Sequence, residues 1–347
     1  MFRKLVMQQP YLDTHLPLAS PVFDATQDKA ALHYLSLDRE RLANNCRAVN
    51  FNALPQPLLV GGQALGKSMI SVPHGGRCYP HGWFDDIHQA RARTLEDTGT
   101  DILGLMLAAR NRPALIAQIG RALCDLNRPE DAVDKQLCPE GTFKPAAVYK
   151  PYIAAGYGVI PRLSAAREPL YSAPFSPDEV AQIITRYHRP YHLMLKDRLQ
   201  AMLEAKSHIL LIDLHSMPDP ARQFNQKKAP ALRRALPDFI FGNLHGATLP
   251  ASLVEGINAV MGTQNYSWGW NAPYAGGYTT RHYGLSYKKA DDKRVSVLQI
   301  EVNRTLFLSP KGKAGEEDKA NGYLDSAALI SIASTLDRLI TELENAS

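Results

Sequence analysis

Cysteines are few in this chain, and none sits at a spacing typical of a metal site or a disulfide scaffold. The four are Cys46, Cys78, Cys124 and Cys138 among 347 residues, and no two of them form a CxxC pair. The spacing indicates neither a zinc ribbon nor a disulfide framework. The simplest interpretation is that all four are reduced thiols in a cytoplasmic protein.

Long apolar segments and runs of like charge are also missing. No apolar run approaches the roughly 18 residues of a membrane-spanning helix, and the apolar core near the N-terminus is too short for a signal peptide. The basic residues number 39 against 34 acidic ones, but they are scattered. This pattern disfavours a nucleic-acid or membrane-surface partner. The net charge of +5 instead suits a small anionic substrate.

The residues that are present have the composition of a soluble globular protein, with 45% hydrophobic and 21% charged residues. Residues 1–55 are expected to form an N-terminal extension with one helix over 27–49. Residues 56–347 are expected to form a single α/β domain. Within it, the segment from about 129 to 177 is rich in Pro, Gly, Ala and Tyr and predicts a long ordered loop insertion, the usual home of substrate-binding loops.

Strand-like and helix-like segments alternate along residues 56–347, which predicts an α/β fold with a mixed or parallel sheet. The Ser176-Pro-Asp-Glu179 segment has the residues of a capping box and predicts a helix start. That helix is expected to be interrupted at His188-Arg-Pro190 and followed by another to about Lys206. The remaining predicted strands are 57–60, 68–72, 209–214, 239–242 and 295–302, and the remaining predicted helices are two within 85–110, one over 250–261 and one over 326–344.

Residues 61–68, Gly-Gly-Gln-Ala-Leu-Gly-Lys-Ser, match the phosphate-loop pattern GxxxxGK[ST] letter for letter. A phosphate loop must open a helix whose N-terminal amides hold the phosphates. Here the next residues, Met-Ile-Ser-Val-Pro, predict a strand stopped by proline. We therefore interpret the segment as a glycine hairpin between two strands, with a nucleotide-binding enzyme as the less favoured alternative.

Two apolar runs are each followed by a histidine at the point where the strand is expected to leave the sheet. Met69–Val72 leads to His74, and Ile209–Leu214 leads to His215. A lone histidine is usually structural, but two in matching positions suggest a site at one sheet edge, since imidazole is the commonest zinc ligand. Asp213 is a candidate partner that orients an imidazole. The acidic candidates for a third ligand are Asp85, Asp86, Glu96, Asp97 and Asp101.

Arginines in loop-like sequence point to a substrate with carboxylates. Arg128, preceded by Asn127, and Arg162, Arg189 and Arg281 each sit beside Pro, Gly or Tyr. A guanidinium binds a carboxylate through two parallel hydrogen bonds. The alternative for each arginine is a local ion pair or a bond to a backbone carbonyl.

The segment Gln299-Ile-Glu-Val-Asn-Arg304 predicts a strand with Gln299, Glu301 and Asn303 on one face. A carboxylate at a strand end can act as a general base toward water activated by a metal. A salt bridge to a neighbouring arginine explains Glu301 equally well.

Seven of these motifs occur together in one order. They are Ser-Val-Pro-His-Gly-Gly, Asp-Thr-Gly-Thr-Asp, Asp-Leu-Asn-Arg-Pro, Tyr-His-Arg-Pro-Tyr-His, Leu-Ile-Asp-Leu-His-Ser, Gly-Gly-Tyr-Thr-Thr-Arg-His-Tyr-Gly and Leu-Gln-Ile-Glu-Val-Asn-Arg. Over about residues 68–308 the chain resembles the N-formylglutamate amidohydrolase family, which is related to zinc carboxypeptidases and aspartoacylases. The resemblance implies a three-layer α/β domain with a mixed sheet. It also implies hydrolysis of N-formyl-L-glutamate to formate and glutamate, in histidine breakdown.

The resemblance also implies roles for individual residues. His74 and His215 would be ligands of zinc or another divalent transition metal, with Asp97 as the third ligand and Asp101 as its rival. Glu301 would be the general base or would stabilise the tetrahedral intermediate. Asn127, Arg128, Arg162 and Arg281 would bind substrate carboxylates, and His192 would line the pocket.

The sequence departs from the family pattern after its first histidine and in its acidic motif. His74 is followed by Gly-Gly where Ser-Gly or Ala-Gly is commoner, and the acidic motif lacks the Asp-Thr-Asp-Trp-His form. These departures leave the substrate open to another N-formyl or N-acyl amino acid. A binding protein that holds such molecules without cleaving them is the remaining alternative.

Overall fold

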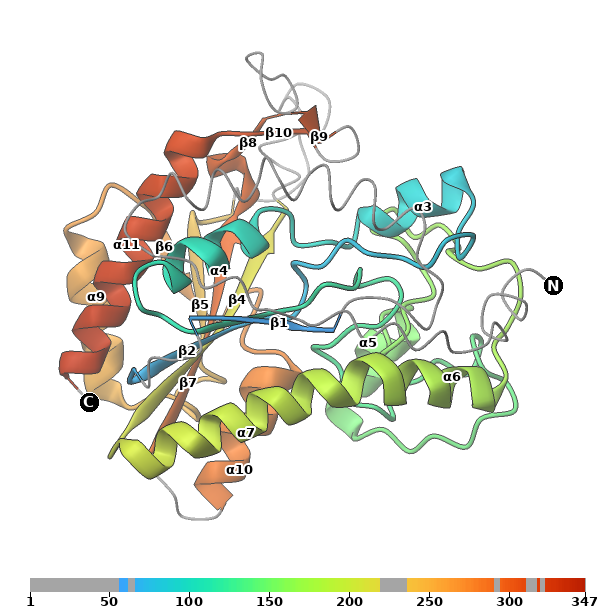
Figure 1. The fold of residues 1–347 in the computed structure, drawn as a ribbon, viewed down its shortest axis with the longest axis horizontal. Coiled ribbons are helices and arrows are strands. Elements are labelled where there is room, and N and C mark those ends of the chain that lie inside the picture. The colour runs from blue at the N-terminus through green and yellow to red at the C-terminus, as the bar shows by residue number, and fades with distance from the viewer. Residues whose placement is uncertain are drawn as a thin grey trace. The chain divides into compact units, whose positions relative to one another are not determined.

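The computed structural model describes residues 56–61, 66–218, 236–289, 294–309, 317–318 and 322–346 (Figure 1). The predicted N-terminal extension and its helix over 27–49 lie outside these residues. The strands are β1 (Leu58–Val60), β2 (Ser68–Val72), β3 (Ala114–Ile116), β4 (Ile209–Met217), β5 (Phe239–Gly242), β6 (Trp268–Trp270), β7 (Val295–Asn303), β8 (Leu308–Ser309), β9 (Glu317–Asp318) and β10 (Gly322–Leu324). The α-helices are α3 (Asp86–Arg93), α4 (Thr100–Ala108), α5 (Lys150–Ala154), α6 (Pro177–Ile183), α7 (Arg189–Ala205), α9 (Ala251–Gly262), α10 (Tyr278–Lys289) and α11 (Ser326–Asn345).

Seven strands form a mixed sheet in the order β1-β3-β2-β4-β7-β5-β6. Strands β2, β4 and β7 are parallel, β5 is antiparallel to β7, and β6 is parallel to β5. Every residue of β2, β4, β5 and β7 is buried. Strands covered on both faces lack the polar alternation of half-exposed strands, which explains their near-continuous apolar sequences. The mixed-sheet α/β class and the predicted strands at 68–72, 209–214, 239–242 and 295–302 are confirmed, whereas kinship with zinc exopeptidases stays a prediction.

The chain divides into two compact units, which we describe separately. The described part of unit 1 comprises residues 56–60, 73–96 and 116–197, and unit 2 comprises the described residues of 61–72, 97–115 and 198–347. The single domain over 56–347, with its insertion at about 129–177, stays a prediction.

Unit 2 holds the central strands and a layer of helices formed by α4, α9 and α11. Helix α11 packs against α9 and α4, and Figure 1 shows α11 beside α9. The buried side chains of α11 recur every three or four residues, as on one face of an amphipathic helix. Its first turn is closed by Asp325, whose carboxylate accepts hydrogen bonds from the N–H groups of Ala327 and Ala328. The helices predicted over 250–261 and 326–344 are therefore confirmed.

Unit 1 consists of short helices and long ordered turns. Helix α6 begins with the predicted capping box between Ser176 and Glu179. The predicted interruption at His188 is wrong, because α6 continues through one π-helical turn, Ile184–His188, into α7. Pro190 has no N–H to donate, and the wider π turn accommodates the missing bond. Figure 1 accordingly shows α6 and α7 as one continuous rod.

The segment that matches the phosphate-loop pattern leads into a strand, as predicted. β2 begins at Ser68, directly after Lys67, so no helix starts there. The predicted hairpin is nevertheless wrong, because β3 lies between β1 and β2 in the sheet.

The cysteines are not all reduced. Cys124 and Cys138 are free and buried. Cys78 is disulfide-bonded. The prediction of reduced thiols is therefore wrong for Cys78.

Candidate active site

The register of β4 and β7 places the polar residues of unit 2 opposite one another. Asp213 pairs with Gln299, and His215 pairs with Glu301. All four are buried. Because side chains two residues apart point to the same face of a strand, these four residues share one face of the sheet. His215 was predicted to follow its strand, but β4 continues through it to Met217.

Both ring nitrogens of His215 face carboxylates. Nδ1 lies 2.8 Å from Oδ2 of Asp97, and Nε2 lies 3.1 Å from Oδ1 of Asp213. Burial lowers the pKa of His215, but Asp213, Asp97 and the charge of Glu301 outweigh it and raise the pKa well above its ordinary value. In the metal-free protein His215 is therefore a protonated imidazole held between two carboxylates.

Asp97 is fixed by an arginine that the sequence analysis assigned no role. Nη2 of Arg304 donates to Oδ1 of Asp97 at 3.1 Å, and its Nε donates to Oγ of Ser216 at 2.9 Å. Ser216 in turn donates to the carbonyl of Thr98 at 3.1 Å. The acidic loop turns into α4 at Gly99, whose φ of 87° is a left-handed conformation that glycine adopts without strain. Arg304 thus ties this loop to the end of β4.

Glu301 is oriented by a neighbour on its own strand. Nε2 of Gln299 donates to Oε1 of Glu301 at 2.9 Å, and Oε1 of Gln299 accepts a hydrogen bond from the backbone N–H of Gly277 at 2.7 Å. This confirms that the two side chains share a face of β7. The salt bridge to a neighbouring arginine, considered as an alternative for Glu301, is not among its contacts described here.

Helix α10 contributes two further residues near this polar face of the sheet, Thr280 and Arg281. Thr280 donates through Oγ1 to Oδ2 of Asp213 at 3.2 Å. Arg281 was predicted in a loop, but it lies in the first turns of α10 and is half-buried. A helical position fixes its backbone more firmly than a loop does.

His74 lies in unit 1, two residues beyond the end of β2. Its Nε2 donates to Oδ1 of Asp125 at 2.7 Å. Asp125 also accepts hydrogen bonds from Nε of Arg121 at 2.9 Å and from the backbone N–H of Asn127 at 2.9 Å. Burial raises the pKa of Asp125, but Arg121, His74 and Arg128 outweigh it and hold the pKa well below its ordinary range. An ionised Asp125 accepts the proton of Nε2 in a hydrogen bond and so fixes the orientation of the His74 ring.

The glycines after His74 serve the fold. A Cβ atom on Gly76 would overlap the carbonyl oxygen of Ile119. Gly76 therefore permits the close approach of two backbone segments, which pair at the bridge between Cys78 and Ile119.

Arg128 is buried within unit 1 and held on three sides. Its Nη1 donates to the carbonyl of Asn127 at 2.8 Å, and its Nε donates to the carbonyl of Tyr157 at 3.1 Å. The guanidinium carbon lies 4.6 Å from the ring centre of Tyr152. Burial lowers the pKa of Arg128, although the charge of Asp125 opposes this shift. The group stays charged and fixed in one orientation.

Three other residues that the sequence suggested for substrate binding form hydrogen bonds or ion pairs with protein groups. His192 donates through Nε2 to the carbonyl of Leu126 at 2.8 Å. Arg162 pairs with Asp134 at 2.8 Å, and Arg189 forms an exposed ion pair with Glu130 at 2.9 Å. Local pairing was the stated alternative for both arginines; substrate binding by Arg162 and His192 stays a prediction.

His74, Asp97 and His215 are all buried, and the ligand atoms that they offer lie within 4.8 Å of one another. Two imidazoles and one carboxylate match the three protein ligands of a catalytic zinc site, which keeps one position open. The group can therefore bind a divalent metal ion. Asp101, the rival third ligand, lies in the first turn of α4 and does not belong to the group.

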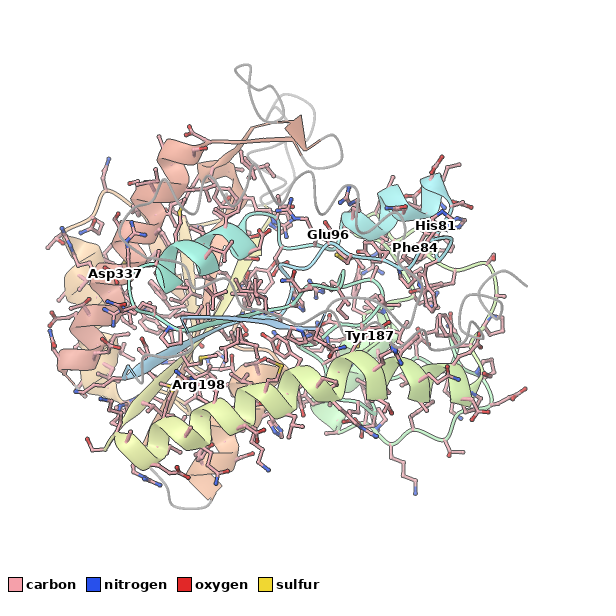
Figure 2. All side chains as sticks on the ribbon, in the orientation of Figure 1. His81, Phe84, Glu96, Tyr187, Arg198 and Asp337 are labelled. Atoms are coloured by element: carbon pink, nitrogen blue, oxygen red, sulfur yellow. The ribbon has the colours of Figure 1, made fainter. Side chains whose placement is uncertain are left out.

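The remaining acidic candidates have other partners. Asp85 caps α3 by accepting the N–H of His88, and Asp86 lies exposed in the first turn of that helix. Glu96 accepts a hydrogen bond from the hydroxyl of Tyr79 at 3.1 Å, and Figure 2 labels it.

A cavity of about 640 Å³ in unit 1 is lined by Asp85, one of the acidic candidates, but by none of the residues to which the family resemblance assigns a role. Its wall includes a chain of contacting aromatic rings formed by Phe84, Tyr171, Phe175 and Trp83. Figure 2 labels Phe84 and the nearby His81. The candidate site is therefore distinct from this cavity in the residues that form it.

Sequence reasoning missed the residues that support the predicted ligands. Asp125 and Arg304 occur in two of the seven motifs, but the sequence pattern predicted no role in the site for either residue. Two signals were available: a metal-binding histidine usually donates its other N–H to an acceptor, and a buried carboxylate ligand is usually hydrogen-bonded. The sequence alone offered several acids for each role, and only the fold selects Asp125 and Arg304.

Comparison with known proteins supports an amide-hydrolysing class. A family model described as N-formylglutamate amidohydrolase matches residues 67–308. The curated N-formylglutamate deformylase of Pseudomonas putida is 29% identical over 245 residues, covering 69% of this chain and 81% of that protein. The protein of the same name from Pseudomonas aeruginosa is 27% identical over 244 residues, with the same coverage.

Solved structures agree with the sequence comparisons. The crystal structure of N-formylglutamate amidohydrolase from Ralstonia eutropha superposes with a TM-score of 0.64 at 26% identity, covering 80% of this chain and 92% of that one. A gene product from Agrobacterium tumefaciens has a TM-score of 0.54 at 12% identity, covering 83% and 94%, and shows a similar fold.

The fold and the named relatives are those of an α/β enzyme that hydrolyses amides. Because the family model matches more than half of the chain, the chain belongs to the N-formylglutamate amidohydrolase family. Within the described residues, no helix is long and apolar enough to cross a bilayer.

Proposed function

We propose that this chain is a metal-dependent amidohydrolase that cleaves the formyl amide of N-formyl-L-glutamate to formate and glutamate. The observation that carries the proposal is the buried group of His74, Asp97 and His215, with Glu301 opposite His215 in the sheet register. The names of the relatives from Pseudomonas and Ralstonia support the substrate.

The three ligand residues would hold a zinc ion or another divalent transition metal. Such an ion polarises a carbonyl oxygen and lowers the pKa of water toward about 7. His74 is prepared for this role because Asp125 binds its Nε2 and fixes the orientation of the ring. Asp97 is prepared by Arg304, which fixes one carboxylate oxygen.

Glu301 would act as the general base. Its carboxylate takes a proton from the water that attacks the formyl carbon, and it then delivers that proton to the amide nitrogen as the C–N bond breaks. The bond from Gln299 orients the carboxylate of Glu301 through its Oε1. The products are formate and glutamate, with no further reactant needed.

Substrate carboxylates would be bound by Arg128 and Arg281, together with Asn127. Arg128 supports this role by its fixed, buried guanidinium, because a group that is already ordered loses little entropy on binding. Arg281 supports this role by its position in the first turns of α10. The preceding residue of that helix, Thr280, donates a hydrogen bond to Asp213. Two arginines suit a substrate with two carboxylates.

A metal assay combined with a substrate screen tests the proposal. Purified protein is expected to contain about one equivalent of a transition metal and to release glutamate from N-formyl-L-glutamate. Two comparison substrates are tested beside it. N-acetyl-L-glutamate changes the acyl group, and N-formyl-L-glutamine replaces one carboxylate by an amide. Cleavage of the acetyl compound alone would move the proposal to another N-acyl amino acid. Binding of all three without turnover would make the chain a binding protein. A cytoplasmic location and a role in histidine breakdown stay predictions.

A further inference from the structure

Three successive backbone carbonyls in unit 1 each accept a hydrogen bond from a side chain. Nε2 of His192 donates to Leu126 at 2.8 Å, Nη1 of Arg128 donates to Asn127 at 2.8 Å, and Nε2 of His188 donates to Arg128 at 2.7 Å. The segment lies outside all helices and strands, so no ladder satisfies these carbonyls. Side chains thus satisfy these carbonyls, and a backbone hydrogen bond from the N–H of Arg128 to the carbonyl of Asp125 closes the turn.

The two histidines reach this segment from one face of one helical rod. His188 is the last residue of the π turn, and His192 lies four residues later in α7, so their side chains are neighbours. Their ring centres are 4.5 Å apart, and the ring of Tyr191 meets His192 edge-on at 5.5 Å. Figure 2 labels Tyr187, one residue before His188, where α6 passes into α7. This packing restricts both imidazoles to one orientation.

The protonation of both rings follows from their partners. A carbonyl only accepts, so Nε2 of His188 and of His192 must each carry a proton. Burial lowers the pKa of His188, which keeps the ring neutral at pH 7 although Glu130 lies 3.8 Å from its Nδ1. Glu130 is itself paired with Arg189 at the surface.

The segment held by the two histidines carries residues of the proposed site. Asp125, which orients His74, directly precedes Leu126, and Arg128 ends the segment. The backbone N–H of Asn127 donates to Asp125, so a shift of the segment would disturb both the ligand and the arginine.

We propose that His188 and His192 are positioning residues, which hold the backbone of residues 126–128 so that Asn127 and Arg128 meet a substrate carboxylate. This inference rests on the proposed function, and it assigns His192 a positioning role in place of the predicted role in lining the pocket. The two histidines act from one face of the helical rod because four residues separate them in the sequence.

The first test is kinetic and uses N-formyl-L-glutamate. His188→Leu and His192→Leu are expected to lower kcat/KM by about 10- to 100-fold, mainly by raising KM, with metal content unchanged. His188→Gln keeps an N–H donor at similar reach and is expected to recover most of the activity. The matched control is His81→Ala, an exposed histidine of the same unit. A loss in kcat alone, or no recovery in the glutamine variant, would overturn the inference.

A second test asks whether His188 acts through Arg128. When Arg128→Ala is already present, adding His188→Leu is expected to cost little more activity, because the group that it positions is gone. Full additivity of the two losses would contradict the proposal. A general loss of folding is detected separately, as a fall in Tm that the glutamine variant does not restore.

Hydrogen exchange of residues 125–129 separates this inference from the proposed function. Faster exchange of this segment in the leucine variants, with exchange elsewhere unchanged, is expected whether or not the wild type cleaves N-formyl-L-glutamate. If the wild type is inactive on every screened compound but exchange responds, the proposed substrate fails and the histidines still hold the segment. Unchanged exchange would overturn the inference itself.

Discussion

His215 and Glu301 lie directly opposite each other on the neighbouring parallel strands β4 and β7. Neighbouring strands are about 4.8 Å apart, so the two side chains on one face are close. The charge of Glu301 contributes to the raised pKa of His215, as this proximity requires. A slip of one residue in the register would turn Glu301 to the other face. The pairing of β4 with β7 is thus what brings a proposed ligand and a proposed base together.

Replacement of Glu301 by Gln tests the proposed base directly. Glutamine has the same shape and still accepts the bond from Gln299, but it takes no proton. We expect kcat/KM to fall by roughly 10²- to 10⁴-fold, with metal content and Tm nearly unchanged. Glu342→Gln, an exposed position on α11, is the matched control. Activity within a few-fold of wild type would assign Glu301 a structural role.

Much of the fold was predictable because the central strands are buried on both faces. β4 begins with an apolar run and β7 alternates apolar with polar residues in its second half, and these patterns predicted both strands. The same reasoning placed His74 and His215 at a common site, since parallel strands end at the same sheet edge. The predicted ligand group of these histidines with Asp97 agrees with the geometry.

The supporting contacts were not predictable because they join residues far apart in the chain. Arg304 and Asp97 are separated by 207 positions, and His74 and Asp125 by 51. Local pattern specifies neither pairing. The π turn was missed for a related reason: Pro190 signals a disturbed helix, but only packing decides whether the helix breaks or widens.

Metal binding is expected to release a proton from His215. The raised pKa means that the metal-free protein keeps this proton at pH 7, and a ligand imidazole must lose it. The stabilising effect of protonated His215 is fully present below its ordinary pKa of 6.5 and is lost as the pH rises through the raised value. Metal affinity should therefore increase with pH over that window.

Calorimetric titration of metal-free protein with zinc chloride measures this release. At pH 7 the observed enthalpy should differ between two buffers of unlike ionisation enthalpy by an amount corresponding to about one proton. His215→Asn should bind more weakly and lose the difference. Equal enthalpies in both buffers for the wild type would show that His215 is already neutral.

Arg304 is predicted to support metal affinity through Asp97. Replacement by Leu removes the bonds to Asp97 and to Ser216, so the carboxylate loses its fixed orientation. We expect metal affinity to fall by about 10- to 100-fold, as measured by competition with a chelator. Arg294→Leu, whose bond to the carbonyl of Leu203 is at the surface, is the control. Unchanged affinity would mean that Asp97 is oriented without Arg304.

Asp125 is expected to stabilise the folded protein in a pH-dependent way. Its pKa is depressed, so its contribution is present above the ordinary value of 3.8 and is lost as the pH falls through the depressed value. Asp125→Asn breaks a buried pair with Arg121 and should lower the free energy of unfolding at pH 7 by about 3–5 kcal/mol. The gap between the two proteins should then narrow below about pH 3.8.

Urea unfolding of the metal-free proteins at several pH values measures that gap, and the metal-free form keeps changes in metal affinity out of the comparison. Asp131→Asn is the matched control, because burial raises the pKa of Asp131 and its contribution therefore has the opposite pH dependence. A gap for Asp125→Asn that stays constant down to the acid transition would show that Asp125 is not ionised against Arg121 and His74. The tautomer assigned to His74 would then have to be reversed.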